Sequence, residues 1–402
     1  MSFQDKNILL GVSSSIACYK AAELARSLIK RGANVQVIMT KNAEQFVTPL
    51  TFEQLTGRKC LTDTFERSPI IQVEHISAAQ WADVAVVAPA SANVLAKLAC
   101  GIADDMLTTT ILACGCPKLA APAMNTKMYE NPVTQDNLAK LRHYGWKIIE
   151  PAEGLLACGD IGKGKLADIT DIGDAVEFAV GWEKDYAGKK VLVTAGPTQE
   201  AMDPVRYLTN HSTGKMGYAL ARGAMLRGAE VTLVTGPTNL AVPPYLTAVP
   251  VVSAREMYEA VVSRAAEMDV IIMAAAVADY RPRETAAEKI KKKDEESSLA
   301  LERTDDILAA VGGMRRPEQF LCGFSMETEH MLENSRRKLE KKHVDMIVAN
   351  NLREKGAGFG VDTNVVTLIR KDGEEVLPLL SKNEVAMRIL DTIRIEQEGM
   401  GK

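Results

Sequence analysis

The chain has 402 residues, of which 47% are hydrophobic and 25% are charged, and its formal net charge is −4. This length predicts two or three domains, and the composition is that of an ordinary globular protein. The slightly acidic balance disfavours nucleic acid and anionic membranes as partners.

Targeting and redox features are sparse. The opening "MSFQDKNILL" is charged and leads directly into a strand, which does not resemble a signal peptide. Asp83 and Lys97 interrupt the most apolar long window, residues 81–100, so we predict no membrane span. Seven scattered cysteines indicate a reducing, cytoplasmic compartment. Cys114 and Cys116 lie two residues apart, but no second pair completes a zinc site.

Two similar openings organise the chain. Residues 6–40 read as a short apolar strand, a Gly/Ser turn, an amphipathic helix and a second strand, and residues 189–236 repeat this order. Both openings carry Arg-Gly-Ala before the second strand, at Arg31 and Arg227. A strand, a small-residue turn and a helix begin a βαβ unit, which implies a parallel sheet.

The predicted fold class is therefore α/β, with two tandem Rossmann-like domains. Both domains are expected to be doubly wound with mainly parallel sheets, and the first to be flavodoxin-like. We place the first domain at residues 1–182, a linker at 183–188 and the second domain at 189–402.

The later apolar runs show where ligands are expected. In the first domain, the runs at 84–90, 118–123 and 146–152 each end near a proline; in the second, 269–280 and 345–352 play the same part. Each should finish at the carboxyl edge of its sheet, where open α/β folds bind ligands.

Three short segments have more than one interpretation. The serines of "VSSSIACYK" (12–20) suit either a phosphate or a simple helix cap. "HSTGK" (211–215) fails the P-loop pattern, because Thr209 replaces the first glycine and Met216 follows the lysine. It can still place a helix N-terminus beside an anion. The glycine-rich stretch 155–168 predicts an exposed, mobile flap with Cys158 near its tip.

Two longer stretches carry a family resemblance. "APASANVLAKLACGIADDMLTTT" (88–110) and "APAMNTKMYENP" (121–132) are similar to the two signature stretches of the homo-oligomeric flavin-containing cysteine decarboxylases. With its second half, the chain resembles the bacterial bifunctional phosphopantothenoylcysteine decarboxylase/phosphopantothenate–cysteine ligases of coenzyme A synthesis. The resemblance spans residues 5–395.

For the first half, the resemblance implies an FMN-dependent decarboxylation that gives 4′-phosphopantetheine through a thioaldehyde and an enethiolate. By this likeness, His75 acts on the thiol during oxidation, Asn125 holds the substrate carboxylate and Cys158 donates the proton to the enethiolate. A thiol is mostly protonated at pH 7, which suits that role. The expected FMN contacts are Gly11, Ser13, Ser14, Ile16, Thr40, Pro89, Ser91, Asn93 and Thr108.

For the second half, the resemblance implies that CTP activates 4′-phosphopantothenate as an acyl-cytidylate, which cysteine then attacks. Asn210 is expected to stabilise that intermediate, Arg206 to assist its use, and Lys289 to reach the triphosphate, although a lysine run is commonly a solvated face. The expected CTP contacts are Ala275, Ala276, Asp279, Lys289, Asp306, Ile307, Phe324, Lys338 and Lys342. Mg²⁺ is expected to be held mainly by phosphate oxygens, and its protein ligands are unknown.

The same likeness implies a homo-oligomer, a trimer-based dodecamer with dimerising ligase domains and flavin sites shared between subunits. The expected partners are small molecules only. Two alternatives share the fold of the first half: a flavin-binding regulatory protein without catalysis, and a flavin prenyltransferase. The joint presence of His75, Asn125 and Cys158 disfavours the first, and the ligase half disfavours the second.

Overall fold

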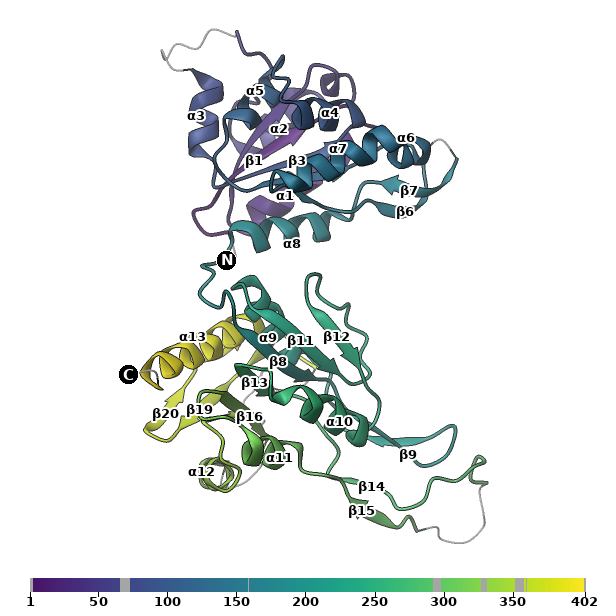
Figure 1. The fold of residues 1–402 in the computed structure, drawn as a ribbon, viewed down its shortest axis with the longest axis vertical. Coiled ribbons are helices and arrows are strands. Elements are labelled where there is room, and N and C mark those ends of the chain that lie inside the picture. The colour runs from purple at the N-terminus through teal and green to yellow at the C-terminus, as the bar shows by residue number, and fades with distance from the viewer. Residues whose placement is uncertain are drawn as a thin grey trace. The chain divides into compact units, whose positions relative to one another are not determined.

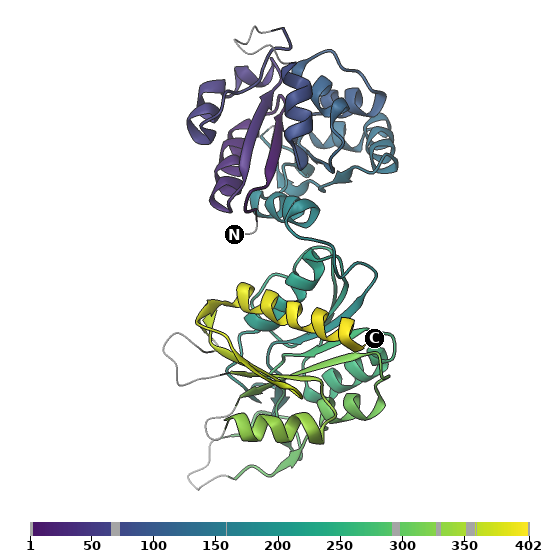
Figure 2. The same cartoon turned by 90° about the vertical axis from the view of Figure 1, so that its left-hand side faces the viewer.

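The computed structural model describes residues 3–65, 73–157, 159–291, 298–326, 331–350, 358 and 360–400. The chain forms two compact units, Met1–Glu183 and Lys184–Lys402 (Figures 1 and 2). None of the described helices is both long and apolar enough to cross a membrane.

The first unit is built on a five-stranded parallel sheet. Its spatial order is β2–β1–β3–β4–β5. The strands are β1 (Asn7–Val12), β2 (Asn34–Met39), β3 (Val84–Ala90), β4 (Lys118–Pro122) and β5 (Lys147–Ile148). This is the flavodoxin order, so the predicted flavodoxin-like α/β fold is confirmed.

Helices cover both faces of this sheet. One face packs against α1 (Cys18–Lys30), α2 (Pro49–Thr56) and α8 (Ile169–Val180). The other packs against α3 (Glu74–Trp81), α4 (Ala92–Cys100), α5 (Met106–Ala113) and α7 (Pro132–His143). Leu10 faces the first core and Leu9 the second, because successive strand side chains point to opposite faces. The remaining elements are the short 3₁₀ helix Ala43–Gln45, the short helix α6 (Thr126–Glu130) and the hairpin of β6 (Ala152–Leu155) and β7 (Ile161–Lys165).

The second unit has an eight-stranded mixed sheet. Its order is β12–β11–β8–β13–β16–β17–β19–β20. The parallel strands are β8 (Lys190–Ala195), β11 (Glu230–Thr235), β12 (Thr247–Pro250), β13 (Val270–Met273), β16 (Phe320–Met326) and β17 (Met346–Asn350). The antiparallel strands β19 (Val366–Arg370) and β20 (Gly373–Val376) extend the β17 edge. When the six parallel strands are numbered along the chain, their spatial order is 3-2-1-4-5-6, which is the Rossmann order.

Five helices flank the second sheet. On one face lie α10 (Ala254–Ala265), α11 (Ile307–Met314) and α12 (Met331–Lys341). On the other, α9 (Lys215–Leu226) packs on β8 and β11, and α13 (Lys382–Met400) packs beside α9 (Figure 1). Two hairpin-like pairs extend from this unit as an arm: β9 (Gln199–Ala201) with β10 (Tyr207–Thr209), and β14 (Tyr280–Pro282) with β15 (Leu301–Arg303). The short strands β18 (Thr363–Asn364) and β21 (Leu380–Ser381) pair with each other.

The repeated Arg-Gly-Ala motif has the same structural role in both units. Gly32 and Gly228 follow the helices α1 and α9 with φ of +100° and +93°, a left-handed turn that glycine adopts without strain. Arg31 forms ion pairs with Asp174 and Glu177, and Arg227 with Asp185 and Asp391. The motif therefore ends the first helix and ties it to a later one.

Two adjacent glycines in α11 offer a test of helix packing. A Cβ at Gly312 would lie 1.9 Å from the carbonyl oxygen of Lys342, whereas a Cβ at Gly313 would have no neighbour within 4 Å. Gly312→Ala should destabilise the second unit by about 1–3 kcal/mol, since helix and turn must separate. Gly313→Ala should be neutral or stabilise by about 0.5–1 kcal/mol.

Amide hydrogen exchange of α11 and β16 in the full chain measures this difference. Faster exchange in Gly312→Ala alone is the expected result, and equal exchange in both variants would contradict the packing.

Candidate functional site

The first crevice lies in the first unit between β1 and β3, where the order of the strands in the sheet reverses. The buried Ser13 hydroxyl donates to the carbonyl oxygen of Pro89 at 2.8 Å and accepts from the amide of Ser91 at 2.8 Å. Ser13 therefore holds together the two loops that leave these strands. Its hydroxyl therefore has one donor and one acceptor partner in the backbone, and its contact with FMN stays a prediction.

A cavity of about 460 Å³ opens at this carboxyl edge. It is bounded by the start of α1, the start of α4, α6 and the β6–β7 hairpin. Four of the predicted site residues line it: Ser14, Ile16, Ser91 and Asn125. Leu155 and Leu156 of the hairpin add an apolar wall, which suits a flat aromatic ligand with one polar end.

Thr40, another predicted FMN contact, does not line this cavity, but its hydroxyl bears on whether the unit fits a ligand. It follows β2, and its amide donates to the carbonyl oxygen of Val12 at 3.0 Å. Its hydroxyl is buried and has no hydrogen-bond partner within the described part of the chain. A buried hydroxyl without a partner is unfavourable unless a ligand forms a hydrogen bond with it. The Thr40 hydroxyl therefore fits a polar group of a ligand at the end of β2.

Asn125 stands at the N-terminus of α6. Its Oδ1 accepts from the amide of Lys127 at 2.9 Å, while its Nδ2 donates to a carboxylate oxygen of Asp160 at 2.8 Å. This second bond joins α6 to the tip of the β6–β7 hairpin. A substrate carboxylate that binds Nδ2 would therefore lie beside the Asp160 carboxylate. Cys158 lies outside the described residues.

The glycine-rich stretch 155–168 contributes to a paired hairpin, β6 with β7, and Leu155 and Ile161 on it are exposed as predicted. Its role as a flap stays a prediction. Gly164 has a φ of +136°, and a Cβ there would lie 2.3 Å from the carbonyl oxygen of Met124. The amide of Met124 in turn donates to the carbonyl of Gly164 at 3.0 Å. Gly164 is thus required for close packing on the Asn125 segment.

The other predicted first-half residues do not line the cavity. Gly11 lies within β1 against Leu107, and Asn93 is exposed on α4. Thr108 is fully buried in the capping box of α5, where its amide and hydroxyl bind Asp105. His75 lies on α3, which Figure 1 shows at the other end of the unit from α6.

In the second unit, two cavities meet beside the carboxyl ends of β13 and β16. Their volumes are about 440 and 410 Å³, and they share Ala275, Val277, Asp279 and Phe324 as a common wall. Asn210 lines the second cavity, and its Nδ2 donates to the carbonyl oxygens of Ala276 at 3.0 Å and Val277 at 3.2 Å. The Asn210 side chain is therefore hydrogen-bonded to the wall that the two cavities share at Val277.

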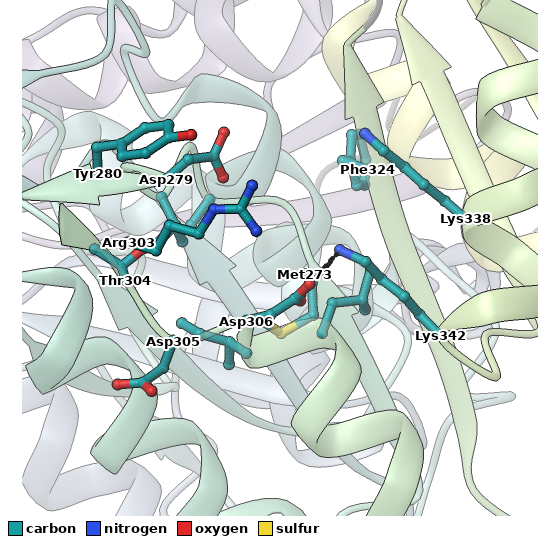
Figure 3. Close-up of a pocket in the computed structure, with 14 residues that line it drawn as sticks. Met273, Asp279, Tyr280, Arg303, Thr304, Asp305, Asp306, Phe324, Lys338 and Lys342 are labelled. Atoms are coloured by element: carbon teal, nitrogen blue, oxygen red, sulfur yellow. Dashed lines mark hydrogen bonds and ion pairs between the residues drawn. The ribbon is translucent and has the colours of Figure 1, made fainter.

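The first of these cavities is lined by three cationic side chains and by the carboxylates of Asp279, Asp305 and Asp306, and we call it the cationic cavity for the three cations (Figure 3). Lys338 and Lys342 reach it from the α12 side, and Arg303 points toward it from β15. Lys342 pairs with Asp306 at 2.9 Å, as Figure 3 shows, while Asp305 points away from both lysines. Burial raises the pKa of the Asp306 carboxyl, but its hydrogen bonds from Lys342 and the Ala309 amide outweigh this and lower it. These cations suit a polyphosphate.

The second cavity ends on the N-terminus of α9. Gly214 precedes this helix with a φ of +78°, and a Cβ at Gly217 would lie 2.6 Å from the Cβ of Ala195. Helix and strand therefore approach closely, as in dinucleotide-binding folds, and the helix N-terminus faces the cavity.

Two lysines stand beside that helix N-terminus. The ammonium of Lys215 binds Asp362 at 2.7 Å, and that of Lys382 binds the carbonyl oxygen of Val361 at 2.6 Å. Burial and the charge of Lys215 lower the pKa of the Lys382 ammonium.

Arg206 and Lys289 lie away from both cavities, on the arm. The guanidinium of Arg206 binds Asp203 through Nε at 2.9 Å and the carbonyl oxygen of Ile290 through Nη2 at 2.8 Å. The hydrogen bond from Arg206 lowers the pKa of the Asp203 carboxyl. Arg206 thus joins the β9–β10 part of the arm to the segment that carries Lys289.

Sequence reasoning missed several residues of the second-unit cavities. They are Arg303, Lys215, Lys382, Asn350 and Asn364. Lys215 lies in the "HSTGK" segment, whose pattern predicts only a helix N-terminus beside an anion. Lys382 begins the last helix, far along the chain, and no local pattern signals it. Among the described residues, no cluster of three or more His, Cys, Asp or Glu side chains could hold a metal ion.

The fold and the sites define a two-domain α/β protein. One ligand crevice lies on a sheet with the flavodoxin strand order, and the other lies on a sheet with the Rossmann strand order. Family comparison agrees with this division: a model described as "Flavoprotein" matches residues 2–181, and one described as "DNA/pantothenate metabolism flavoprotein C-terminal domain" matches residues 186–396.

Relatives match along the full length. The chain is 49% identical over 393 residues to the coenzyme A biosynthesis bifunctional protein CoaBC of Bacillus subtilis (strain 168), with 97% of each chain covered. It is 40% identical over 396 residues to that of Escherichia coli (strain K12), with 98% of each covered.

Solved structures match each half separately. A crystal structure of the C-terminal domain of CoaBC is 49% identical, with 53% of this chain and 99% of that chain covered and a TM-score of 0.46. The FMN-dependent cysteine decarboxylase SpaF is 34% identical, with 45% and 97% covered and a TM-score of 0.40.

The chain belongs to the family of bifunctional coenzyme A biosynthesis proteins. It is an enzyme with phosphopantothenoylcysteine decarboxylase and phosphopantothenate–cysteine ligase activities, on a flavoprotein domain and a ligase domain. The resemblance drawn from the two signature stretches is thereby confirmed.

The cationic cavity can be probed with inorganic pyrophosphate. Lys338 lines this cavity, whereas Lys341, three residues along the same helix, is exposed and does not. Lys338→Met should weaken pyrophosphate binding about tenfold, because one charge-assisted contact is lost. Lys341→Met removes the same charge without that contact and should leave the affinity unchanged.

Isothermal titration calorimetry at fixed ionic strength measures both dissociation constants. If both variants bind pyrophosphate equally weakly, only the overall electrostatic field matters. That result would contradict a direct contact between Lys338 and pyrophosphate.

Proposed function

We propose that the second unit joins cysteine to 4′-phosphopantothenate with CTP, through an acyl-cytidylate, and that the first unit decarboxylates the product with FMN. The observation that carries the ligase half is the wall shared by two cavities, with Asn210 bound to Ala276 and Val277 at that wall. The bond between two substrates must form where their pockets meet, and the shared wall brings the two cavities together.

In this proposal the nucleotide occupies the cationic cavity. Lys338, Lys342 and Arg303 face its phosphates, and Asp306 holds Lys342 in place. Ala275 and Ala276 leave room for the ligand to approach the end of β13, and Phe324 and Ile307 add apolar contact. Mg²⁺ would be bound chiefly by the phosphate oxygens.

The phosphopantothenate would then lie in the second cavity. The N-terminus of α9, Lys215 and Lys382 give that cavity its positive end, which suits an anionic group. Asn210 stands between the cavities and would bind the acyl group as the anhydride forms and as cysteine attacks it. Arg206 and Lys289 act from the arm, whose closure over the nucleotide would bring Lys289 to the phosphates.

In the first unit, FMN would lie across the β1–β3 switch point. Ser14, Ser91 and the Thr40 hydroxyl are available to its polar groups, and Ile16 to its ring. Bound FMN supplies reversible hydride acceptance from the cysteinyl part of the substrate. Asn125 orients the substrate carboxylate, and its neutral amide leaves that carboxylate free to depart as CO2. Cys158 would protonate the remaining carbon.

His75 requires a second subunit in this scheme. It lies on α3, away from the cavity that contains Asn125. A trimer-based dodecamer, with dimerising ligase domains, would bring His75 of one chain to the cavity of another. We also propose a cytoplasmic location, where the scattered cysteines stay reduced.

The full reaction tests the assignment. Purified protein with 4′-phosphopantothenate, cysteine, CTP and Mg²⁺ should form phosphopantothenoylcysteine and then release CO2. Asn210→Asp should lower ligation about a hundredfold, because a carboxylate cannot donate to the two carbonyls and repels an acyl oxygen.

Decarboxylation of supplied phosphopantothenoylcysteine by the same variant is the control and should be unchanged. A parallel loss of both activities would contradict the separate roles, and absence of both products with the unaltered chain would overturn the proposal.

Thr40 tests the flavin half. Thr40→Val keeps the shape but removes the unpaired hydroxyl, so FMN affinity should fall about three- to tenfold while stability without flavin is unchanged or higher. Thr110→Val is the matched control, since the Thr110 hydroxyl already donates to the carbonyl of Met106 at 2.7 Å.

Quenching of flavin fluorescence during titration gives both dissociation constants. Unchanged FMN affinity in Thr40→Val would remove Thr40 from the flavin site.

A further inference from the structure

A fully buried threonine lies behind the wall that the two second-unit cavities share. Thr198 stands between β8 and β9, and none of its surface is exposed. The wall is built from alternate residues of the segment after β13, because Ala275, Val277 and Asp279 line both cavities. Ala278 is buried and lines neither cavity, and Thr198 does not line them either. Any effect of Thr198 on a ligand must therefore pass through the wall.

Hydrogen bonds from two threonines hold Ala278 at both its amide and its carbonyl. The hydroxyl oxygen of Thr198 accepts from the Ala278 amide at 3.0 Å. The hydroxyl of Thr304, which follows β15 of the arm, donates to the Ala278 carbonyl oxygen at 2.6 Å. Because the peptide unit is planar and stiff, these two bonds also set the position of Asp279, the next residue along the chain.

Thr198 is also joined to Asn210. The Thr198 carbonyl oxygen accepts from the hydroxyl of Thr209, the residue before Asn210, at 2.7 Å. The Thr198 amide donates to the carbonyl oxygen of Ala276 at 3.3 Å, and Nδ2 of Asn210 donates to the same oxygen at 3.0 Å. These bonds close a ring through Thr198, Thr209, Asn210 and the wall. A shift of the wall relative to Thr198 is thereby passed to the Asn210 side chain.

The hydroxyl of Thr198 can be removed without changing the shape of the side chain, because valine and threonine have nearly the same volume. In Thr198→Val the Ala278 amide is buried without its acceptor, which is unfavourable. The segment 275–279 must then shift to find another acceptor. Reacting groups have to be held close and aligned, and a misplacement of about 1 Å can slow a reaction about a hundredfold.

We propose that Thr198 is a positioning residue for the ligase reaction, which sets the wall segment 275–279 against Asn210 and touches neither substrate. This inference rests on the proposed ligase function. In that reaction a carboxylate oxygen of 4′-phosphopantothenate bonds to the α-phosphorus of CTP, and pyrophosphate leaves. The amine nitrogen of cysteine then bonds to the acyl carbon and loses a proton, and CMP leaves. Both bonds form at the shared wall, so both steps need the wall in its place.

Steady-state kinetics of the full chain test this role. Thr198→Val should lower kcat of ligation about tenfold, while the KM values for CTP and 4′-phosphopantothenate change less than about twofold. The KM values should hold because the proposed phosphate contacts, such as Lys338 and Lys215, come from helices and not from the wall. Thr198→Ser keeps the hydroxyl and should restore kcat to within about twofold of the unaltered chain.

Two further variants separate positioning from packing. Thr209→Val removes the exposed hydroxyl that binds the Thr198 carbonyl, and should lower kcat about three- to tenfold with the same unchanged KM values. Thr392→Val makes the same substitution at a buried threonine of α13, whose hydroxyl donates to the carbonyl oxygen of Arg388 at 3.0 Å, and should leave kcat unchanged. Decarboxylation of supplied phosphopantothenoylcysteine should be unchanged in every variant.

If kcat stays within about twofold of the unaltered chain in Thr198→Val, or in Thr209→Val should Thr198→Val not fold, the positioning role is overturned. A fall in Thr198→Ser as large as that in Thr198→Val would also overturn it, because the hydroxyl would then not be the cause. Absence of ligation by the unaltered chain would instead overturn the proposed ligase function, and this inference with it.

Discussion

In each unit, polar side chains span the gap between two strands whose connections leave in opposite directions. Ser13 does this in the first unit by binding the Pro89 carbonyl and the Ser91 amide. In the second unit, Asn210 binds the carbonyls of Ala276 and Val277, and the hydroxyls of Thr194 and Thr198 accept from the amides of Ala275 and Ala278. A crevice at such a switch point has exposed backbone groups on both walls. These bridges hold the walls at a fixed separation, and every ligand contact inferred above depends on that separation.

Much of this could be predicted from local pattern. The two strand–turn–helix openings and the Arg-Gly-Ala repeat predicted two parallel sheets, because glycine after a helix and an apolar strand have local causes. The nine expected nucleotide contacts came from the family resemblance, and seven of them line the cationic cavity or its shared wall.

What escaped prediction depends on contacts between distant segments. The loop between β8 and α9 contains the β9–β10 arm, so Gly196, Gly214 and Gly217 are too far apart in sequence to read as one glycine-rich motif. Gly164 looked like a source of mobility, and only its approach to Met124 shows that it serves packing. The position of His75 away from Asn125 is set by tertiary packing, which no short pattern encodes.

The contacts of α11 have a consequence for how Lys342 meets a nucleotide. Asp306 at the start of this helix holds the ammonium of Lys342, and Gly312 lies against the carbonyl oxygen of the same residue. These points are six residues apart, about 9 Å along a helix, so the lysine side chain is stretched along α11. A free lysine loses about 2 kcal/mol of side-chain entropy when it is ordered. Here much of that loss occurs on folding, which leaves a positive charge already oriented before a phosphate arrives.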